Sequence, residues 1–348
     1  MEQVPDLVFI FGYGALAFIL SISLAPKLIA LLRHFKIGKT LRENATSGEK
    51  ASIFNLLHSS KEGTPTMGGV LIWGTTLLVV LFSRFLAFIG IIPQSLLQRN
   101  ETWLVLFALV SFGLIGAIDD WFNIKGFGKS KGMNVKPKFF LVTTMALIGA
   151  LWFYFKLEWN LIHIPGIGDF QIGFWYIPLF MLVLTSSANA VNITDGLDGL
   201  SGGLLTMAYV AFAIIAYTSG QPFLAAFCAV IVGSLVGFLW FNVPPAKFYM
   251  GDTGATALGA TLGVIAMLTN SALMLIVIGG VFVAETLSSA LQLFSKKYLK
   301  KKIFKIAPLH HHFEACGWSE CTVVMRFWII GAMLGVVGVI IAIIGKGV

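Results

Sequence analysis

Acidic side chains follow alternate hydrophobic segments of this chain, and a run of three histidines follows another. The acids are Asp119 and Asp120, then Asp195 and Asp198, then Asp252, and the histidines are His310, His311 and His312. If each hydrophobic segment crosses a bilayer, every second junction faces the same side, so these groups share one membrane face with most of the lysines. Carboxylates gather against their mutual repulsion where a metal ion or a proton requires them. Lysines beside them indicate an anionic partner, most simply a phosphate. The pattern predicts a membrane enzyme that handles Mg²⁺ and phosphate.

The composition is that of a helical membrane protein. Of 348 residues, 57% are hydrophobic and only 11% are charged, whereas a soluble domain carries about 25% charged residues. The apolar runs are long and continuous, without the alternation over about ten residues that barrel strands show. We therefore expect an all-α polytopic membrane protein, folded as one integral membrane domain over residues 1–348.

Ten apolar runs are long enough to cross a bilayer with a hydrocarbon core of about 30 Å. They cover residues 7–32, 69–90, 102–118, 139–156, 174–190, 200–218, 223–241, 254–269, 271–294 and 324–345. The eighth run is short and rich in glycine, so we expect it to be tilted or irregular. After the fourth run, residues 157–173 alternate around a Pro-Gly turn, which predicts a small β-hairpin on the outer surface.

Basic residues are concentrated in three of the connecting loops. Loops 33–68, 119–138 and 295–323 hold most of the lysines and arginines, and the loops on the opposite side hold few. Because cytoplasmic loops carry the excess of basic residues, we expect these three loops in the cytoplasm and both termini outside. The lysines of the cytoplasmic loops then account for the net charge of +8. We expect the protein to contact membrane lipids and no nucleic acid.

The aspartates differ in what their positions imply. Asp119 and Asp120 end the third apolar run, and adjacent positions on a helix point about 100° apart. These two carboxylates therefore either take partners from elsewhere or are solvated residues at a helix end. Asp252 lies between two glycines, where it is either the N-cap of a helix or a hard oxygen ligand for Mg²⁺.

A glycine-rich segment follows the fifth apolar run. In it, Asn192, Asp195 and Asp198 are spaced three apart, which predicts that they face one way on a helical turn. The glycines between them let the backbone come near a ligand. Three such polar groups exceed what a plain polar turn needs, so this segment is interpreted as part of a binding site.

Two further segments carry groups suited to an anion. Lys61 precedes Thr-Pro-Thr66, which is typical of a helix start whose amides, with Lys61, are suited to hold a phosphate. The three histidines cannot all face one point on a regular helix, and with the nearby cysteines they match no familiar zinc pattern. We interpret them as imidazoles that meet a phosphate or a nucleotide. Glu285 and Gln292 lie on one face of the ninth run, where they either line the site or join two helices.

Five strings together resemble the phospho-N-acetylmuramoyl-pentapeptide transferases of bacterial peptidoglycan synthesis, within the superfamily of polyprenyl-phosphate N-acetylhexosamine-1-phosphate transferases. They are KEGTPTMGG at 61–69, the Asp pair at 119–120, NITDGLDGLSGG at 192–203, FYMGDTGA at 248–255 and APLHHHFE at 307–314. The superfamily shares the aspartates, and the His triplet points to the muramoyl-pentapeptide branch. Tyr249 stands where a Phe is expected, which bears only on the uridine pocket.

The resemblance implies ten helices and a homodimer in the bacterial inner membrane, with a cytoplasmic active site. It implies the transfer of phospho-MurNAc-pentapeptide from UDP-MurNAc-pentapeptide to undecaprenyl phosphate, giving lipid I and UMP for cell wall biogenesis, with Mg²⁺ as cofactor. The catalytic residues implied are Asp119 as the candidate base, Asp120 in support, Asp252 and His311; the metal ligands implied are Asp252 and Asn192. Substrate contacts are implied for Lys61, Thr66, Lys125, Asn192, Asp195, Gly196, Leu197, Asp198, Tyr249, Gln292, His310 and His312.

Other interpretations stay open at this point. A sister enzyme would use UDP-GlcNAc in the same chemistry, but the His triplet disfavours it. A cation-coupled transporter would place its acids near the middle of the bilayer, whereas nearly all of the acids here lie at the ends of the apolar runs. The sequence leaves open whether the lipid phosphate attacks directly or an aspartate attacks first.

Overall fold

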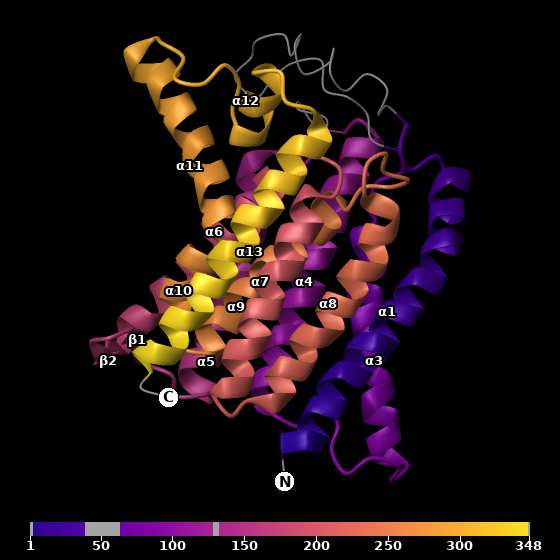
Figure 1. The fold of residues 1–348 in the computed structure, drawn as a ribbon, viewed down its shortest axis with the longest axis vertical. Helices are drawn as coiled ribbons and strands as arrows, with labels where there is room; N and C mark the ends of the chain where they lie inside the picture. The colour runs from indigo at the N-terminus through magenta and orange to yellow at the C-terminus, as the bar shows by residue number, and fades with distance from the viewer. Residues whose placement is uncertain (1–2, 39–62, 128–131, 347–348) are drawn as a thin grey trace.

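The computed structural model describes residues 3–38, 63–127 and 132–346 and shows a bundle of long helices (Figure 1). Nine helices in these ranges are long and apolar enough to cross a membrane, and a bent helix pair makes a tenth. The all-α polytopic architecture expected from the sequence is therefore confirmed. The bundle helices are α1 (Gln3–His34), α3 (Gly69–Phe88), α4 (Asn100–Ile124), α5 (Val135–Lys156), α6 (Tyr176–Thr194), α7 (Leu200–Thr218), α8 (Pro222–Asn242), α9 (Gly251–Leu268), α10 (Ala272–Ile278), α11 (Gly280–Phe294) and α13 (Glu320–Gly345).

Helix α9 forms the centre of the bundle, and every residue from Thr253 to Leu268 is buried. Small residues allow this close packing. A Cβ atom on Gly116 of α4 would overlap the backbone of Asp252, and one on Gly69 of α3 would overlap the backbone of Gly254. The sequence predicts that the eighth span is tilted or irregular, and the second alternative is wrong, since α9 is one uninterrupted helix. Its glycines serve close contact with neighbouring helices.

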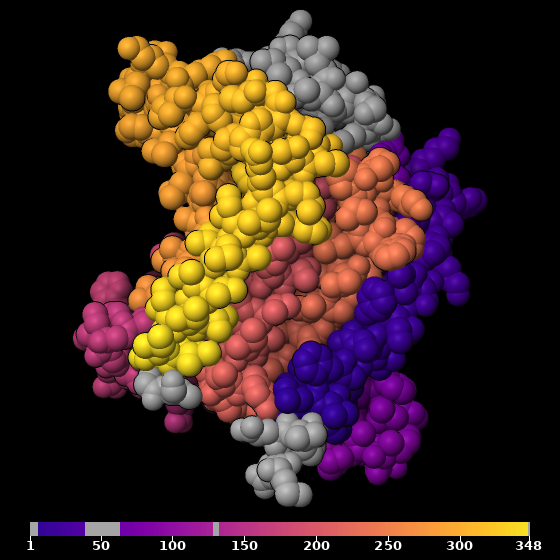
Figure 2. Space-filling view, in the orientation of Figure 1, coloured from indigo at the N-terminus to yellow at the C-terminus, as the bar shows by residue number. Residues whose placement is uncertain are grey.

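The ninth span differs from the single segment 271–294 expected from the sequence. Helices α10 and α11 meet at a bend of 80°, and the short π-helix η3 (Ser295–Leu299) continues α11. The break falls at Gly279 and Gly280, and such glycine pairs are among the common causes of sharp kinks. As a result α11 leaves the bundle and projects beyond it (Figure 2). One face of α11 buries Glu285, Ser288 and Gln292, while Leu287 and Leu291 on the other face are exposed.

The end of the bundle opposite α12 (Leu309–Ala315) carries the only strands in the described residues, β1 (Leu161–Ile164) and β2 (Gly168–Gln171) (Figure 1). They pair antiparallel, as expected for residues 157–173. The hairpin packs on the end of α13, where His163 Nε2 lies 3.2 Å from the carbonyl oxygen of Gly345. The start of α1 lies at the same end of the bundle as the end of α13.

Candidate active site

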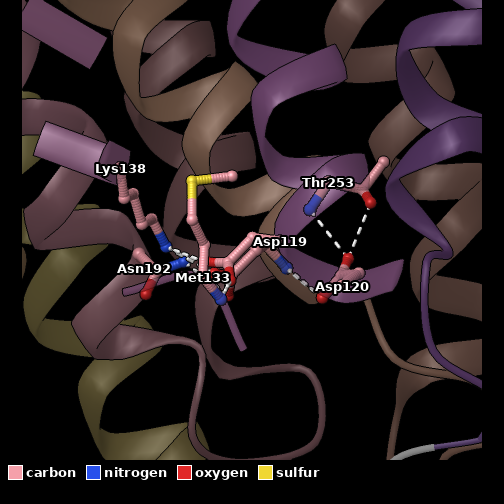
Figure 3. A network of polar contacts seen from close by, with 7 residues as sticks. Asp119, Asp120, Met133, Lys138, Asn192 and Thr253 are labelled. Atoms are coloured by element: carbon pink, nitrogen blue, oxygen red, sulfur yellow. Dashed lines mark hydrogen bonds and ion pairs between the residues drawn. The ribbon is translucent and has the colours of Figure 1, made fainter. Parts of the chain in front are cut away.

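Four helix ends meet at the other end of the bundle and bring their polar side chains together (Figure 3). Helices α4 and α6 finish there, and α5 and α9 begin there. Asp252, which is far from Asp119 and Asp120 in the sequence, is thereby linked to both by hydrogen bonds, to Asp119 through Lys138. The prediction that they gather at one end is confirmed for Asp119, Asp120 and Asp252.

A lysine joins two of the carboxylates. Lys138 Nζ, on the first turn of α5, donates to Asp119 Oδ2 at 2.5 Å and to Asp252 Oδ2 at 2.6 Å. One ammonium thus compensates two negative charges that would otherwise repel each other. The Lys138 side chain is 27% exposed and that of Asp252 is 30% exposed, so the cluster is open to a ligand.

Further donors hold these two carboxylates in place. The side-chain amide of Asn192 donates to Asp252 Oδ1 at 2.8 Å, and the backbone amide of Met133 donates to Asp119 Oδ1 at 2.7 Å. Each carboxylate therefore accepts a hydrogen bond on both of its oxygens. Bonds to charged groups are stronger than those between neutral groups, so the cluster is preorganised before any substrate binds. We call Asp119, Lys138, Asn192 and Asp252 the ion-pair cluster.

Asp120 points away from the ion-pair cluster, as expected for a residue adjacent to Asp119 on a helix. It accepts from the backbone amides of Asp252 at 3.2 Å and Thr253 at 2.9 Å, and from the Thr253 hydroxyl at 2.6 Å. These amides belong to the first turn of α9, where amides lack partners within the helix and negative charge is favoured. Asp120 thus caps α9 from α4, and its place in catalysis remains a prediction. Gly251 has φ +71°, and a Cβ atom there would come within 2.5 Å of Asp120 Oδ2.

The segment before α3 lies alongside the segment before α9. The Tyr249 amide donates to the Pro65 carbonyl at 2.8 Å, and the Gly68 amide donates to the Tyr249 carbonyl at 2.7 Å. This pairing places buried Thr66 next to Gly251, one residue from Asp252. Thr66 and Tyr249 are therefore adjacent to the site. Lys61 lies outside the described residues.

The glycine-rich segment 192–199 does not form the single face expected for its three polar residues. Helix α6 ends at Thr194, so Asp195 and Asp198 are not on a helical turn with Asn192. Asn192, on the last turn of α6, donates to Asp252. Asp198 instead accepts from the Ala246 amide at 2.9 Å, and its own amide donates to Glu320 at 2.8 Å. Leu197 is buried beside them.

The three histidines lie on the short helix α12 and take three different partners, so they do not face one point, as the sequence predicted. His310 Nδ1 lies 3.0 Å from Glu285 Oε2, and His311 Nδ1 lies 2.7 Å from Glu314 Oε2. His312 Nδ1 accepts from the Lys305 amide at 3.2 Å. Among the other predicted substrate contacts, Gly196 packs against His310.

Two more predicted substrate contacts make protein contacts in the structure. Lys125 stacks over the ring of Trp121 at the end of α4, with Nζ 5.0 Å from the ring centroid. Gln292 exchanges hydrogen bonds with the backbone of Phe304 and also accepts from the Ile303 amide. Its side-chain amide thus holds the loop that leads to α12.

Lys138 is the main residue that the sequence reasoning missed. The predicted span began at residue 139, which assigned Lys138 to the loop as one more topological charge. The helix begins at Val135, so Lys138 lies inside it. A lysine within a membrane helix is costly unless it is paired, and a span extended to Val135 would have shown that Lys138 needs an acidic partner.

The oxygen atoms of the ion-pair cluster are of the kind that binds Mg²⁺. Among the described residues, no group of three or more His, Cys, Asp or Glu is placed to hold a metal ion. However, Asp119 and Asp252 already converge on one cation, the Lys138 ammonium. Carboxylate and amide oxygens are the ligands that Mg²⁺ prefers, with water and substrate phosphates completing its shell. Asp252, Asp119 and Asn192 supply such oxygens.

Comparison with known proteins places the chain among membrane transferases. Residues 102–270 match the family model described as glycosyl transferase family 4, and residues 61–72 match phospho-N-acetylmuramoyl-pentapeptide-transferase signature 1. A relative from Geobacillus sp. (strain WCH70) is 38% identical over 349 residues, which is 99% of each chain. One from Bacillus pumilus (strain SAFR-032) is 39% identical over 99% of each chain. One from Chloroflexus aurantiacus (strain ATCC 29366 / DSM 635 / J-10-fl) is 39% identical over 95% of this chain and 89% of its own. All three are named phospho-N-acetylmuramoyl-pentapeptide-transferase.

Proposed function

The chain belongs to the phospho-N-acetylmuramoyl-pentapeptide-transferase family and is a multi-pass membrane enzyme of that family, and we propose that it transfers phospho-MurNAc-pentapeptide from UDP-MurNAc-pentapeptide to undecaprenyl phosphate. The products are UMP and lipid I. The observation that supports this most directly is the ion-pair cluster, in which residues from α4, α5, α6 and α9 converge. Such a cluster suits a reaction between two anionic phosphates.

The reaction exchanges one diphosphate for another. An oxygen of the lipid phosphate attacks the phosphorus that carries the sugar, and the bond from that phosphorus to the UMP oxygen breaks. The electron pair leaves with UMP. Fixed positive groups stabilise the charge that develops at the phosphorus, which is commonly the largest contribution to catalysis. Lys138 is positioned to supply such a charge.

We assign Asp119 the role of holding Lys138, whose ammonium orients the lipid phosphate. Both of its oxygens accept hydrogen bonds, one from the Met133 amide and one from Lys138. These bonds withdraw electron density from the carboxylate, which disfavours it as a covalent nucleophile. Direct attack by the lipid phosphate is therefore the mechanism we propose. Lipid phosphates are already ionised near neutral pH, so little deprotonation is needed.

We propose Mg²⁺ as the cofactor, with Asp252 and Asn192 among its ligands. Bound there, it would neutralise charge on the diphosphate. This assignment is supported by the hard oxygen atoms of the cluster and by the 30% exposure of the Asp252 side chain, which leaves it open to an incoming ion. His311, held by Glu314, is assigned to the donor side of the site.

We propose that the enzyme lies in the bacterial inner membrane, with the ion-pair cluster on the cytoplasmic side and both termini on the periplasmic side. The lysine-rich loops support this orientation. The β-hairpin, the start of α1 and the end of α13 lie at the opposite end of the bundle from α12, as this orientation requires. We also propose a homodimer, as the family resemblance implies.

The test is UMP release by purified protein in detergent. UDP-MurNAc-pentapeptide and undecaprenyl phosphate should give UMP and lipid I with Mg²⁺, and turnover should stop when EDTA is added and return with excess Mg²⁺. UDP-GlcNAc in place of the muramoyl donor should be used poorly. Efficient use of UDP-GlcNAc would assign the chain to the sister enzymes, and full turnover in EDTA would remove the metal from the proposal.

A further inference from the structure

A buried carboxylate–imidazole pair lies outside the ion-pair cluster. Glu285 of α11 is 0% exposed and His310 of α12 is 1% exposed. Glu285 Oε2 lies 3.0 Å from His310 Nδ1, and Glu285 Oε1 accepts from the His310 backbone amide at 3.1 Å. One carboxylate therefore holds both the ring and the backbone of His310.

This arrangement fixes which ring nitrogen is available. A carboxylate only accepts hydrogen bonds, so Nδ1 of His310 carries the hydrogen and donates a hydrogen bond to Glu285. The remaining ring atom, Nε2, faces away from Glu285. Within the described part of the chain, Nε2 is buried and has no hydrogen-bond partner. Buried polar atoms in native proteins are nearly always paired, and an orphan at a site suggests a missing ligand atom.

The unpaired atom faces the segment that precedes α7. A Cβ atom placed on Gly196 would overlap His310 Nε2, so the ring packs directly against this glycine. Gly196 lies between Asn192, which binds Asp252, and Leu197. The free nitrogen of His310 is thus only one short segment away from the ion-pair cluster.

The bend between α10 and α11 makes this contact. Without the 80° change of direction at Gly279, α11 would continue along the bundle, and Glu285 would not reach α12. The same face of α11 carries Gln292, which holds the loop at Ile303 and Phe304. The buried face of α11 therefore anchors α12 at two points.

We propose that Glu285 is a positioning residue that orients His310 so that Nε2 hydrogen-bonds the anionic nucleotide-sugar donor. The proposal rests on the proposed function, because it concerns the donor of that same reaction. Glu285 acts only through His310 and touches no substrate. Its removal should therefore weaken donor binding more than it slows the chemical step.

The experiment is a double-mutant cycle with Glu285→Gln, His310→Ala and the two combined. We measure kcat and KM for UDP-MurNAc-pentapeptide, KM for undecaprenyl phosphate, and donor binding by titration calorimetry. Glu285→Gln should raise the donor KM and Kd about tenfold, as for one lost hydrogen bond to a charged group. Its KM for the lipid should stay unchanged. The double variant should match His310→Ala, because two residues that act as one unit are not additive.

Two further variants separate positioning from folding. Gly196→Ala pushes on the imidazole from the opposite side and should also raise the donor KM. Ser288→Ala removes a buried hydroxyl one turn along α11, where it donates to the Glu285 carbonyl, without touching His310. It should keep the wild-type donor KM. If Glu285→Gln does not fold, Gly196→Ala and His310→Ala carry the test.

The outcomes are distinct. If wild-type protein releases no UMP, the proposed function fails and this inference falls with it. If the wild type is active but the effects of Glu285→Gln and His310→Ala multiply, Glu285 does not act through His310. A lower melting temperature of Glu285→Gln with an unchanged donor KM and Kd would make the pair purely structural. Either of the last two results overturns the positioning role and leaves the transferase function standing.

Discussion

The two ends of the bundle both hold charged side chains, and they use them for different purposes. At one end, Lys138 bridges two carboxylates from different helices, the buried Asp119 and the partly exposed Asp252. At the other end, Lys346 donates to the Ser219 hydroxyl and the Thr269 carbonyl, and His163 meets a backbone carbonyl. The first arrangement concentrates opposite charges at the site where we propose that phosphates bind. The second ties the end of the chain to its neighbours, mostly through neutral groups.

The most decisive test of this comparison is an all-or-none difference in labelling. In a chain with its three cysteines replaced by serine, a cysteine at Asp169 should react with a membrane-impermeant reagent added outside. A cysteine at Lys301 should not, because lysine-rich loops stay in the cytoplasm. Reaction at both positions in sealed cells would mean that the two ends do not face opposite sides.

Next in size is the loss of the bridging ammonium. Lys138→Met should reduce UMP release by about 10³-fold, because Asp119 and Asp252 would repel each other and the developing charge would lose its nearest cation. Lys136→Met is the matched control, since Lys136 is exposed two residues earlier and should keep normal turnover. Equal losses of turnover in both variants would mean that Lys138 acts only by adding positive charge to this region, and not by bridging the two carboxylates.

Asp252 tests the metal assignment. Asp252→Asn keeps the shape of the side chain and removes its charge, so turnover should fall about 10²-fold and the Mg²⁺ concentration for half-maximal activity should rise. The Asn192 contact can persist, which limits structural damage. Near-normal turnover with ordinary Mg²⁺ dependence would leave Asp252 as a residue of the first turn of α9 and nothing more.

Asp120 should affect stability more than its neighbour Asp119 does. Asp120→Ala removes three hydrogen bonds at the start of α9, so the protein should lose about 1–2 kcal/mol, as for a lost helix cap. Thermal unfolding in detergent measures this loss. Asp119→Ala, which leaves the α9 amides capped, is the comparison variant. A smaller loss of stability for Asp120→Ala than for Asp119→Ala would contradict the capping assignment.

The smallest effect is expected at the opposite end. His163→Ala removes the contacts with Asp169 and Gly345, so unfolding should become easier by about 1 kcal/mol or less. UMP release at a temperature well below unfolding should match that of the wild type. A clear loss of turnover would show that the hairpin end communicates with the ion-pair cluster, and the contrast between the two ends would then fail.

Much of this arrangement could be predicted from the sequence, because hydrophobic length and loop charge determine which residues share an end. That reasoning placed Asp119, Asp120 and Asp252 together and located the hairpin. It missed Lys138 because an apolar run does not show how far a helix extends into its basic flank. It missed the break at Gly279 because the run 271–294 stays apolar across it. It expected Asp195 and Asp198 on one helical turn with Asn192, because nothing in the spacing shows that α6 ends at Thr194.

The enclosure of α9 has a consequence for how the enzyme responds to its membrane. Because Thr253 to Leu268 are all buried, α9 has almost no contact with lipid. Bilayer thickness and lateral pressure therefore have little direct effect on the position of Asp252. Helix α11 is the opposite case, with Leu287, Leu291 and Phe294 exposed along its length. A change in lipid composition can therefore shift α11 and, through Glu285, the position of His310. The carboxylate of Asp252 at the start of α9 would keep its position.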